Sequence, residues 1–251
     1  MVAKSKTLEN IAIKICNLSK NFKHVNALKN INLNINKGEI IALVGGNGAG
    51  KSTLIKLLSG VYLQDEGYFY IDGKKIINLT PELSIKLGIT TVYQDLSLVD
   101  TLNIPSNIFL GNEPIKNKVF LDKKRMFLES EKLIKKLNLN IPSLDVDVSM
   151  LSGGQRQGIA MARAINQGGR VLILDEPTAA MGVKESSEIF NLIKTLSNEG
   201  YTIILICHNI QQVFNVSHRI VAMYHGEIIA NLKTSDTNEK EVINYINGLS
   251  T

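Results

Sequence analysis

The chain has 251 residues, 44% of them hydrophobic and 20% charged, which is enough for one full core or two small ones. Its net charge is +5, and we take its lysines to be scattered, which disfavours a nucleic-acid partner. A solvated surface is the simplest interpretation, and a basic face toward anionic lipid stays open. No stretch approaches the roughly 20 apolar residues of a membrane helix, and no signal peptide is expected. Cys16 and Cys207 look like buried thiols in a reducing compartment.

The first third of the chain predicts antiparallel strands around one parallel strand. Apolar and polar residues alternate over 9–35, which is the period of half-exposed strands. Residues 68–74 read as a further strand and a tight turn. Between them, Ile40–Val44 is a continuous apolar run suited to a buried parallel strand. A helix is expected from about residue 52.

The remaining chain predicts a helical insertion followed by strand–helix alternation. Residues 105–165 read as a mostly helical subdomain, with an amphipathic helix over 123–139. Strands are then expected at 171–174 and 202–207, with a helix at 186–196 between them, which indicates a parallel sheet with crossover helices. A weaker helix is expected over 237–251.

Residues 45–53 carry the motif around which the chain is organised, because they match the phosphate-binding pattern G-x-x-x-x-G-K-[ST]. Its glycines let backbone N–H groups converge on one anion at the start of a helix. Lys51 is expected to reach the β- and γ-phosphates of ATP, and the Ser52 hydroxyl to ligate Mg²⁺. A glycine turn that binds nothing is the alternative. The nucleotide-binding residues expected here are Gly45, Gly46, Asn47, Gly48, Ala49, Gly50, Lys51, Ser52 and Thr53.

Two further motifs follow in order. A Leu-Ser-Gly-Gly-Gln sequence at 151–155 opens a helix, and Asp175 and Glu176 follow a buried strand. Asp175 is expected to hold Mg²⁺ through water, and Glu176 to polarise the attacking water. Alone, these are equally a helix cap and an acidic turn. In this order, across essentially the whole chain, they resemble the ATP-binding subunits of ABC transporters.

This resemblance implies an α/β fold: a P-loop NTPase core with a parallel sheet, an antiparallel β subdomain and a helical subdomain, in one domain over 1–251. It implies catalytic roles for Lys51, Gln94, Glu176 (as general base) and His208 (at the γ-phosphate). Gln94 would also touch Mg²⁺ and sense the membrane partner. Phe22 stands where the family stacks an aromatic ring on adenine, with core packing as the alternative.

The same resemblance implies a dimer that holds two ATP molecules between Lys51 of one chain and Ser152 of the other. The residues acting across that interface are Leu151, Ser152, Gly153, Gly154 and Gln155. ATP would close the dimer and hydrolysis would open it. The second subunit is a copy of this chain or a similar ATPase, peripheral on the cytoplasmic face of the membrane. A permease would meet residues 95–114, a substrate-binding protein would act indirectly, and no nucleic acid is expected.

The stretches 92–98, 107–114 and 175–186 look like those of importers of ribose, xylose and fructose. Gly182 agrees with that branch, whereas most ABC ATPases carry aspartate there. Importers of amino acids or nucleosides, soluble ABC ATPases acting on ribosomes or DNA, and a binding-only module are the alternatives. Cargo follows by association alone, because the ATPase does not touch the sugar.

Overall fold

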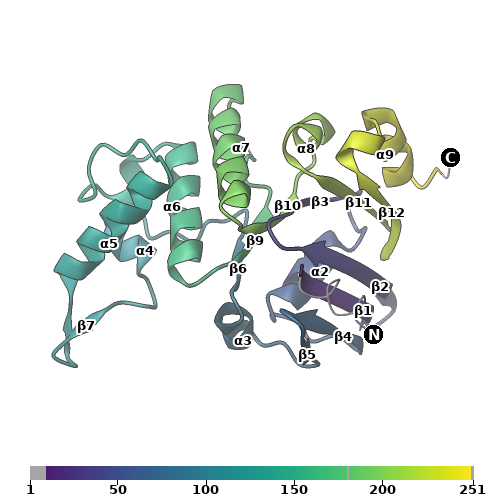
Figure 1. Cartoon of the computed structure of the whole chain (residues 1–251), viewed down its shortest axis with the longest axis horizontal. Helices are drawn as coiled ribbons and strands as arrows, with labels where there is room; N and C mark the ends of the chain where they lie inside the picture. Colours follow the sequence, from purple (N-terminus) through teal and green to yellow (C-terminus); the bar gives the residue numbers. More distant parts are fainter. Residues whose placement is uncertain (1–9, 180, 250–251) are drawn as a thin grey trace.

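The computed structural model describes residues 10–179 and 181–249. The expected strand start at residue 9, Ala180 of the stretch 175–186, and the end of the expected C-terminal helix at 250–251 lie outside the described residues. Two sheets lie toward one end of the molecule, and an arm of helices extends to the opposite end (Figure 1).

One sheet is antiparallel, with four strands in the order β2-β1-β4-β5. Its strands are β1 (Ile11–Phe22), β2 (Val25–Asn36), β4 (Glu66–Ile71) and β5 (Lys74–Ile76). The second half of β2 alternates strictly between buried and exposed residues, as its sequence predicts. Lys23, with a φ of 50°, provides the left-handed residue that turns β1 into β2 at the rim of the site described below.

The second sheet has six strands in the order β12-β11-β3-β10-β9-β6 and is parallel except for β12. Its strands are β3 (Ile40–Val44), β6 (Ile89–Val92), β9 (Val171–Asp175), β10 (Thr202–Ile206), β11 (Arg219–Tyr224) and β12 (Glu227–Lys233). Both faces are covered, so β3 and β10 are buried along their whole length. The carboxyl ends of the parallel strands share one edge, which is where ligands bind in such sheets.

Helices cover both faces of the parallel sheet and build the arm. They are α2 (Lys51–Leu58), α3 (Pro81–Lys86), α4 (Ile104–Ile108), α5 (Lys123–Lys136), α6 (Gly153–Asn166), α7 (Val183–Asn198), α8 (Ile210–Val216) and α9 (Glu239–Ile246), with 3-10 helices at Val148–Met150 and Thr234–Asp236. None among the described residues is long and apolar enough to cross a membrane.

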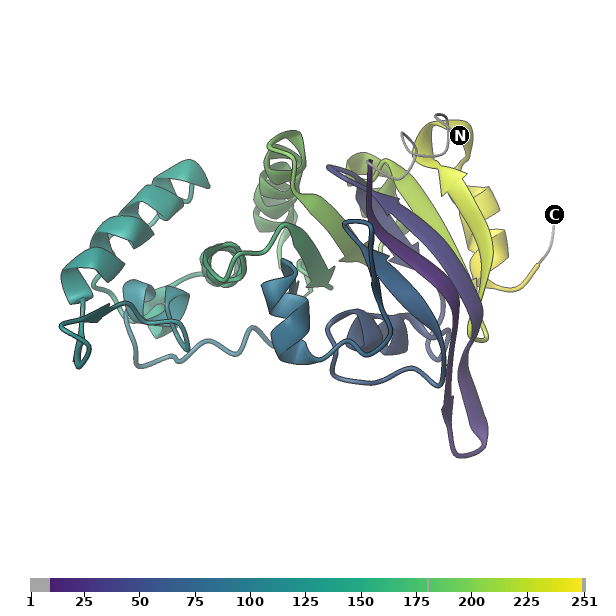
Figure 2. The ribbon, with the colours of Figure 1, turned by 60° about the horizontal axis from the view of Figure 1, so that its bottom comes forward.

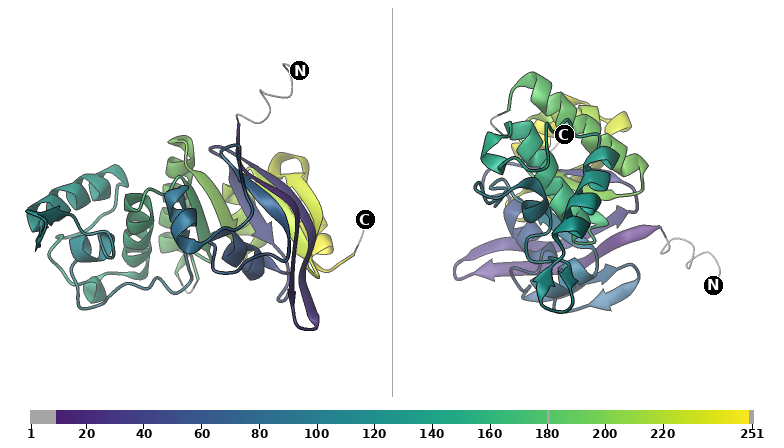
Figure 3. Two further views of the ribbon diagram at one scale, coloured as in Figure 1. Left: turned by 90° about the horizontal axis from the view of Figure 1, so that it is seen from below. Right: turned by 90° about the vertical axis from the view of Figure 1, so that its left-hand side faces the viewer.

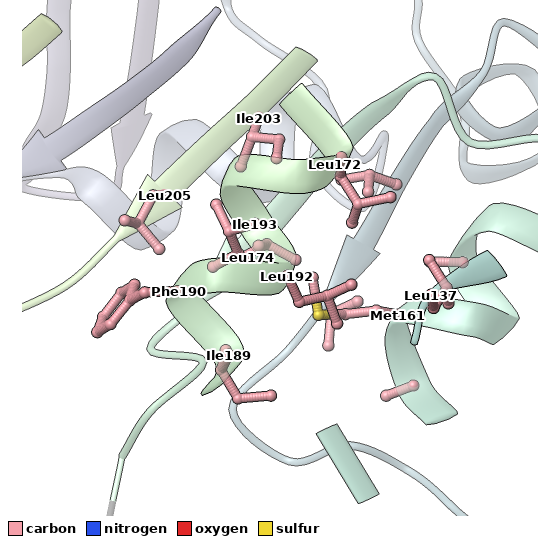
Figure 4. Close-up of a cluster of buried hydrophobic side chains, with 14 of the residues drawn as sticks. Leu137, Met161, Leu172, Leu174, Ile189, Phe190, Leu192, Ile193, Ile203 and Leu205 are labelled. Atoms are coloured by element: carbon pink, nitrogen blue, oxygen red, sulfur yellow. The ribbon is translucent and has the colours of Figure 1, made fainter. Parts of the chain in front are cut away.

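The core has two parts because successive strand residues point to opposite faces. In β3, Ile40 and Ala42 belong to the part under α6 and α7, whereas Ile41 and Leu43 belong to the part under α2 and the antiparallel sheet. Figure 4 shows α7 presenting aliphatic and aromatic side chains toward Leu174 of β9 and Leu205 of β10. The phosphate-loop strand is therefore fixed from both sides.

The arm contains α4, α5 and α6: α6 packs on the parallel sheet, and α4 and α5 extend beyond it, away from both sheets (Figure 2 and the left view of Figure 3). It also holds a hairpin of two short strands, β7 (Ile115–Lys116) and β8 (Phe120–Leu121), within the stretch expected to be mostly helical. The amphipathic helix expected over 123–139 ends earlier, at Lys136, and β11, β12 and α3 were not expected at all.

Candidate functional site

The phosphate loop links β3 to α2 and packs tightly against its neighbours. Gly45 has a φ of 156°, and a Cβ there would lie 2.4 Å from the Met223 carbonyl oxygen of β11. Gly50 has a φ of 104°, and a Cβ there would lie 2.7 Å from the Ala27 carbonyl oxygen of β2. Glycine is required at both positions, because only it tolerates this backbone and this closeness.

Lys51 is the first residue of α2, and its side chain turns back over the loop. Its Nζ donates hydrogen bonds to the carbonyl oxygens of Gly45 at 2.7 Å and Gly46 at 3.1 Å. Burial lowers the pKa of this amine, and the nearby carboxylates of Glu176 and Asp175 oppose that shift. The ammonium thus lies between two carbonyl groups and two acidic residues.

Above the loop lies an open cavity of about 790 Å³. Its lining contains most of the predicted nucleotide-binding and catalytic residues, namely Phe22, Asn47, Gly48, Ala49, Gly50, Lys51, Ser52, Thr53, Asp175, Glu176 and His208. Gly45 and Gly46 are not part of the described lining; their carbonyl oxygens accept hydrogen bonds from Lys51, which is part of it. The cavity therefore joins an aromatic ring, an amine and two carboxylates drawn from distant parts of the chain.

Sequence reasoning missed several residues that line the same cavity: His24, Val25, Asn26, Ala27 and Lys29 near the β1–β2 turn, Ile206 of β10, and His225 in the β11–β12 turn. Those from His24 to Lys29 could have been predicted to line the cavity, because they closely follow Phe22 in the sequence. His225 carries no such signal. It reaches the cavity because the Gly226 amide donates to the Ala49 carbonyl at 3.1 Å.

The two acidic residues differ in backbone and surroundings. Asp175 ends β9, and its pKa is raised by burial and by the charge of Glu176, with Lys51 acting in the opposite direction. Glu176 has a φ of 51°, a strained value for a residue with a side chain. Its amide donates to the Ile206 carbonyl at 3.0 Å, and its Oε1 lies 2.8 Å from Nε2 of His208. A carboxylate and an imidazole are thus paired at the edge of the sheet.

Phe22, 38% exposed, stands at the other end of the cavity and is supported from behind. Its ring meets Tyr62 edge-on, with centroids 5.1 Å apart, and the Nζ of Lys20 lies 5.4 Å from its centroid. Asp65 accepts from Lys20 Nζ at 2.7 Å and from the Asn21 amide at 2.6 Å. These hydrogen bonds, that of Lys20 first, lower the pKa of Asp65. Tyr62 and Asp65 follow α2 in the chain, so the segment after the helix that begins at Lys51 supports the ring of Phe22.

Gln94 and the Leu-Ser-Gly-Gly-Gln loop do not join this cavity in the described chain. Gln94 lies exposed in a bend after β6. Ser152 caps α6: its Oγ accepts from the Gln155 amide at 3.3 Å, and Gln155 Oε1 accepts from the Ser152 amide at 2.9 Å. Ser152, Gly154 and Gln155 line a separate cavity of about 630 Å³ beside α7.

Two arginines of α6 hold the segment that follows Gln94. Arg163 donates to the carbonyl oxygens of Leu96 at 2.5 Å and Ser97 at 2.9 Å, and burial lowers its pKa. Arg156 forms an ion pair with Asp100 at 2.7 Å. The segment after β6 is therefore fastened to α6, the helix that Ser152 caps.

The site suits a divalent metal only together with a phosphate ligand. The described residues contain no group of three or more His, Cys, Asp and Glu that could hold a metal ion. The cavity offers Asp175 and the exposed Ser52, close to the loop expected to bind phosphate. Mg²⁺ is often held in this way, by one or two protein oxygens plus phosphates and water.

The profile of the ABC transporter family matches residues 28–179, and the chain belongs to this family. It is 44% identical to the xylose/arabinose import ATP-binding protein of Sulfolobus acidocaldarius over 92% of this chain and 91% of that protein. It is 39% identical to the ribose import ATP-binding protein of Clostridium tetani over 92% of this chain, but spans only 46% of that protein.

Solved structures agree with this assignment. A nucleotide-free ATP-binding cassette from an ABC transporter superimposes with a TM-score of 0.82 at 27% identity, covering 95% of each chain. A dimeric ATP-binding cassette in a post-hydrolysis state, bound to ADP and Pi, superimposes with a TM-score of 0.74 at 28% identity, covering 88% of this chain and 98% of that one. The expected α/β fold of ABC ATPases is confirmed.

Proposed function

We propose that this chain binds ATP with Mg²⁺ and hydrolyses it to drive the import of a small sugar through a separate permease. The observation that carries the ATPase part is the single cavity containing Lys51, Ser52, Asp175, Glu176 and His208. The sugar part is supported by relatives whose names specify import of xylose, arabinose and ribose. Phosphoryl transfer needs positioning and charge stabilisation above all, which these residues can supply.

Each residue has a defined task in this proposal. Lys51 would exchange the carbonyls of Gly45 and Gly46 for phosphate oxygens. Ser52 and Asp175 would hold Mg²⁺, which neutralises phosphate charge when bound. Glu176 would accept a proton from the attacking water, while His208, 2.8 Å away, orients its carboxylate and faces the γ-phosphate. Phe22 would stack on the adenine.

We further propose that the chain works as a dimer beneath the permease. Ser152 and its loop lie outside their own chain's nucleotide cavity, which fits a role at the phosphates of a second subunit. A solved cassette of this family is dimeric. Gln94 and residues 95–114 would report the state of the permease, and Gln94 would join Mg²⁺ only in the nucleotide-bound state. The chain would lie at the cytoplasmic face of the membrane.

The test is Glu176→Gln, measured by ATP hydrolysis and by light scattering after size exclusion. Turnover should fall by at least about 10²-fold, the usual worth of a general base, while ATP binding is kept. The variant should dimerise with ATP and remain monomeric without it. Glu82→Gln, an exposed glutamate of α3, is the control and should behave as wild type. Wild-type turnover in Glu176→Gln would overturn the general-base assignment.

The cargo needs a separate measurement. In vesicles containing the permease and its binding protein, ATP hydrolysis by this chain should rise when pentoses are supplied, and amino acids or nucleosides should have no effect. Stimulation by an amino acid or nucleoside would replace the sugar proposal and leave the ATPase proposal intact.

A further inference from the structure

The hairpin of β7 and β8 exposes an unusual amount of apolar surface. Val119 is 76% exposed and Phe120 70%, and Ile115 and Leu121 are also exposed. We call these four residues the apolar tip. Nothing else in the described chain covers them, and the hairpin lies at the extremity of the arm, at the opposite end of the long axis from β12 and α9 (Figures 1 and 3).

The hairpin that carries the apolar tip has a defined backbone structure. Lys116 pairs with Phe120, so three residues connect the strands, and two of them, Asn117 and Lys118, have positive φ, 52° and 64°, as tight hairpin turns often require. The Val119 amide donates to the Lys116 carbonyl at 3.3 Å, and the Asp122 amide closes the base by donating to the Pro114 carbonyl at 2.8 Å. Lys118 adopts this conformation without the freedom of glycine, so the turn holds its side chains outward at an energetic cost.

Basic charge is concentrated in the hairpin that carries the apolar tip and in the helix α5 that follows it, which corrects the expectation of scattered lysines. Residues 115–136 carry eight lysine or arginine residues and three acidic ones, a net charge of +5, equal to that of the whole chain. The rest of the sequence is therefore electrically balanced. Arg125, Lys135 and Lys136 pair with glutamates. The others nearest the tip are exposed and make no ion pair within the described residues: Lys116, Lys118, Lys123 and Lys124.

This combination fits one kind of partner. Apolar side chains ringed by lysines suit the interface of an anionic bilayer, where the apolar groups enter the headgroup boundary and the lysines meet lipid phosphates. The cytoplasmic loops of a permease carry an excess of lysine and arginine themselves, so their charge opposes this surface. A second copy of the chain would bring the same positive charge. A nucleic acid would contact the lysines through its phosphates but would leave the apolar residues exposed to water.

We propose that the apolar tip and its lysines form a second, direct contact of the chain with the anionic surface of the membrane, separate from the contact with the permease. This inference assumes only that the chain works beside a membrane, and it needs no ATP hydrolysis. The far end of the arm would then face the bilayer.

The full chain should float with vesicles of phosphatidylcholine containing phosphatidylglycerol, should not float with phosphatidylcholine alone, and should dissociate as salt is raised. Lys116→Gln with Lys118→Gln should weaken binding about 25-fold, because each of the two lysines near such a surface contributes about a fivefold factor. Val119→Ser with Phe120→Ser should weaken it at least as much. Lys194→Gln with Lys240→Gln, which removes the same charge from exposed lysines elsewhere, should bind like wild type.

ATP turnover separates this proposal from the proposed function. Both tip variants should hydrolyse ATP at the wild-type rate, and loss of turnover in Glu176→Gln should leave vesicle binding unchanged. The lipid contact would be overturned if the chain bound neutral vesicles as well as anionic ones, or if the tip variants bound like wild type. It would also be overturned if the control pair lost as much vesicle binding as the tip variants. Failure to bind anionic vesicles, combined with loss of permease capture in detergent by the tip variants, would overturn it as well and would assign the tip to the permease.

Discussion

The ring of Phe22 is held by neighbours outside the described lining of the nucleotide cavity. Tyr62 meets its edge, Lys20 lies beside it, and Asp65 fixes both Lys20 and the Asn21 amide. A stacking residue near the end of a strand and at the rim of an open cavity needs such support, because a free rotamer would lose entropy on every binding event. Tyr62 and Asp65 are therefore positioning residues for the proposed adenine contact.

We predict that Tyr62→Leu raises the KM for ATP about 3- to 10-fold with kcat unchanged, since an aromatic pair contributes roughly 0.5–1.5 kcal/mol. Tyr62→Phe should restore the wild-type KM, because the ring makes the contact. Phe22→Ala should raise KM further, as stacking contributes about 1–3 kcal/mol. Steady-state kinetics with ATP measures all three. An unchanged KM in Phe22→Ala would refute stacking itself, whereas an effect there with none in Tyr62→Leu would refute only the support.

Spacing along the sequence was enough to predict which residues of the phosphate loop and of the Asp-Glu pair meet. Lys51, Asp175 and Glu176 each follow a buried strand of one parallel sheet, so their meeting at one edge follows from the fold class. The strained backbone of Glu176 and the presence of His225 could not be predicted. Both depend on how loops from separate strands pack, and no local pattern reports that.

At the scale of elements, prediction failed for two very short strands and for one longer pair. β7 and β8 have two residues each, too few for a period of two to be visible, and their turn lacks glycine. β11 and β12 had a usable signal that was overlooked, an apolar run at 220–223 before the pair His225–Gly226. The long elements were predicted in kind, with ends that shifted by a few residues, as for α7, which begins at Val183.

The link between α6 and the segment after β6 depends on Arg163. We predict that Arg163→Met lowers the free energy of unfolding by about 1–3 kcal/mol, because two carbonyl acceptors lose a charged donor. Urea unfolding followed by circular dichroism measures this. Arg170→Met, at an exposed arginine, is the matched control and should change stability little. Equal effects of the two substitutions would mean that Arg163 does not fasten the segment.

At the scale of the whole molecule, one chain divides the expected ATP contacts between two places. Lys51 lines the nucleotide cavity, whereas Ser152 lies in another cavity beside α7. The capping box that holds Ser152 is the helix-cap alternative considered from the sequence, and it is present. The cap occupies the amides of Ser152 and Gln155, so a role at a second subunit's phosphates would fall to the Ser152 hydroxyl and the amides of Gly153 and Gly154 at the start of α6.

We predict that Ser152→Arg, added to Glu176→Gln, abolishes ATP-dependent dimerisation while the monomer still binds ATP, because the bulky cation blocks the loop surface offered to the second subunit. Light scattering gives the dimer, and equilibrium dialysis with labelled ATP gives the binding. Ser235→Arg in the same background should dimerise normally. If Ser152→Arg also removed ATP binding by the monomer, the loop would be acting on its own chain's nucleotide.

Lys51 holds the phosphate loop together from within. Its ammonium donates hydrogen bonds to the carbonyls of Gly45 and Gly46, and these bonds stabilise the loop conformation without a phosphate ligand. In the proposed function, ATP would enter by an exchange of the partners of the Lys51 amine, with few backbone dihedrals left to order and little entropy lost in ordering them. On this proposal, ATP binding would begin with an exchange of hydrogen-bond partners, and the loop would not have to fold around the nucleotide.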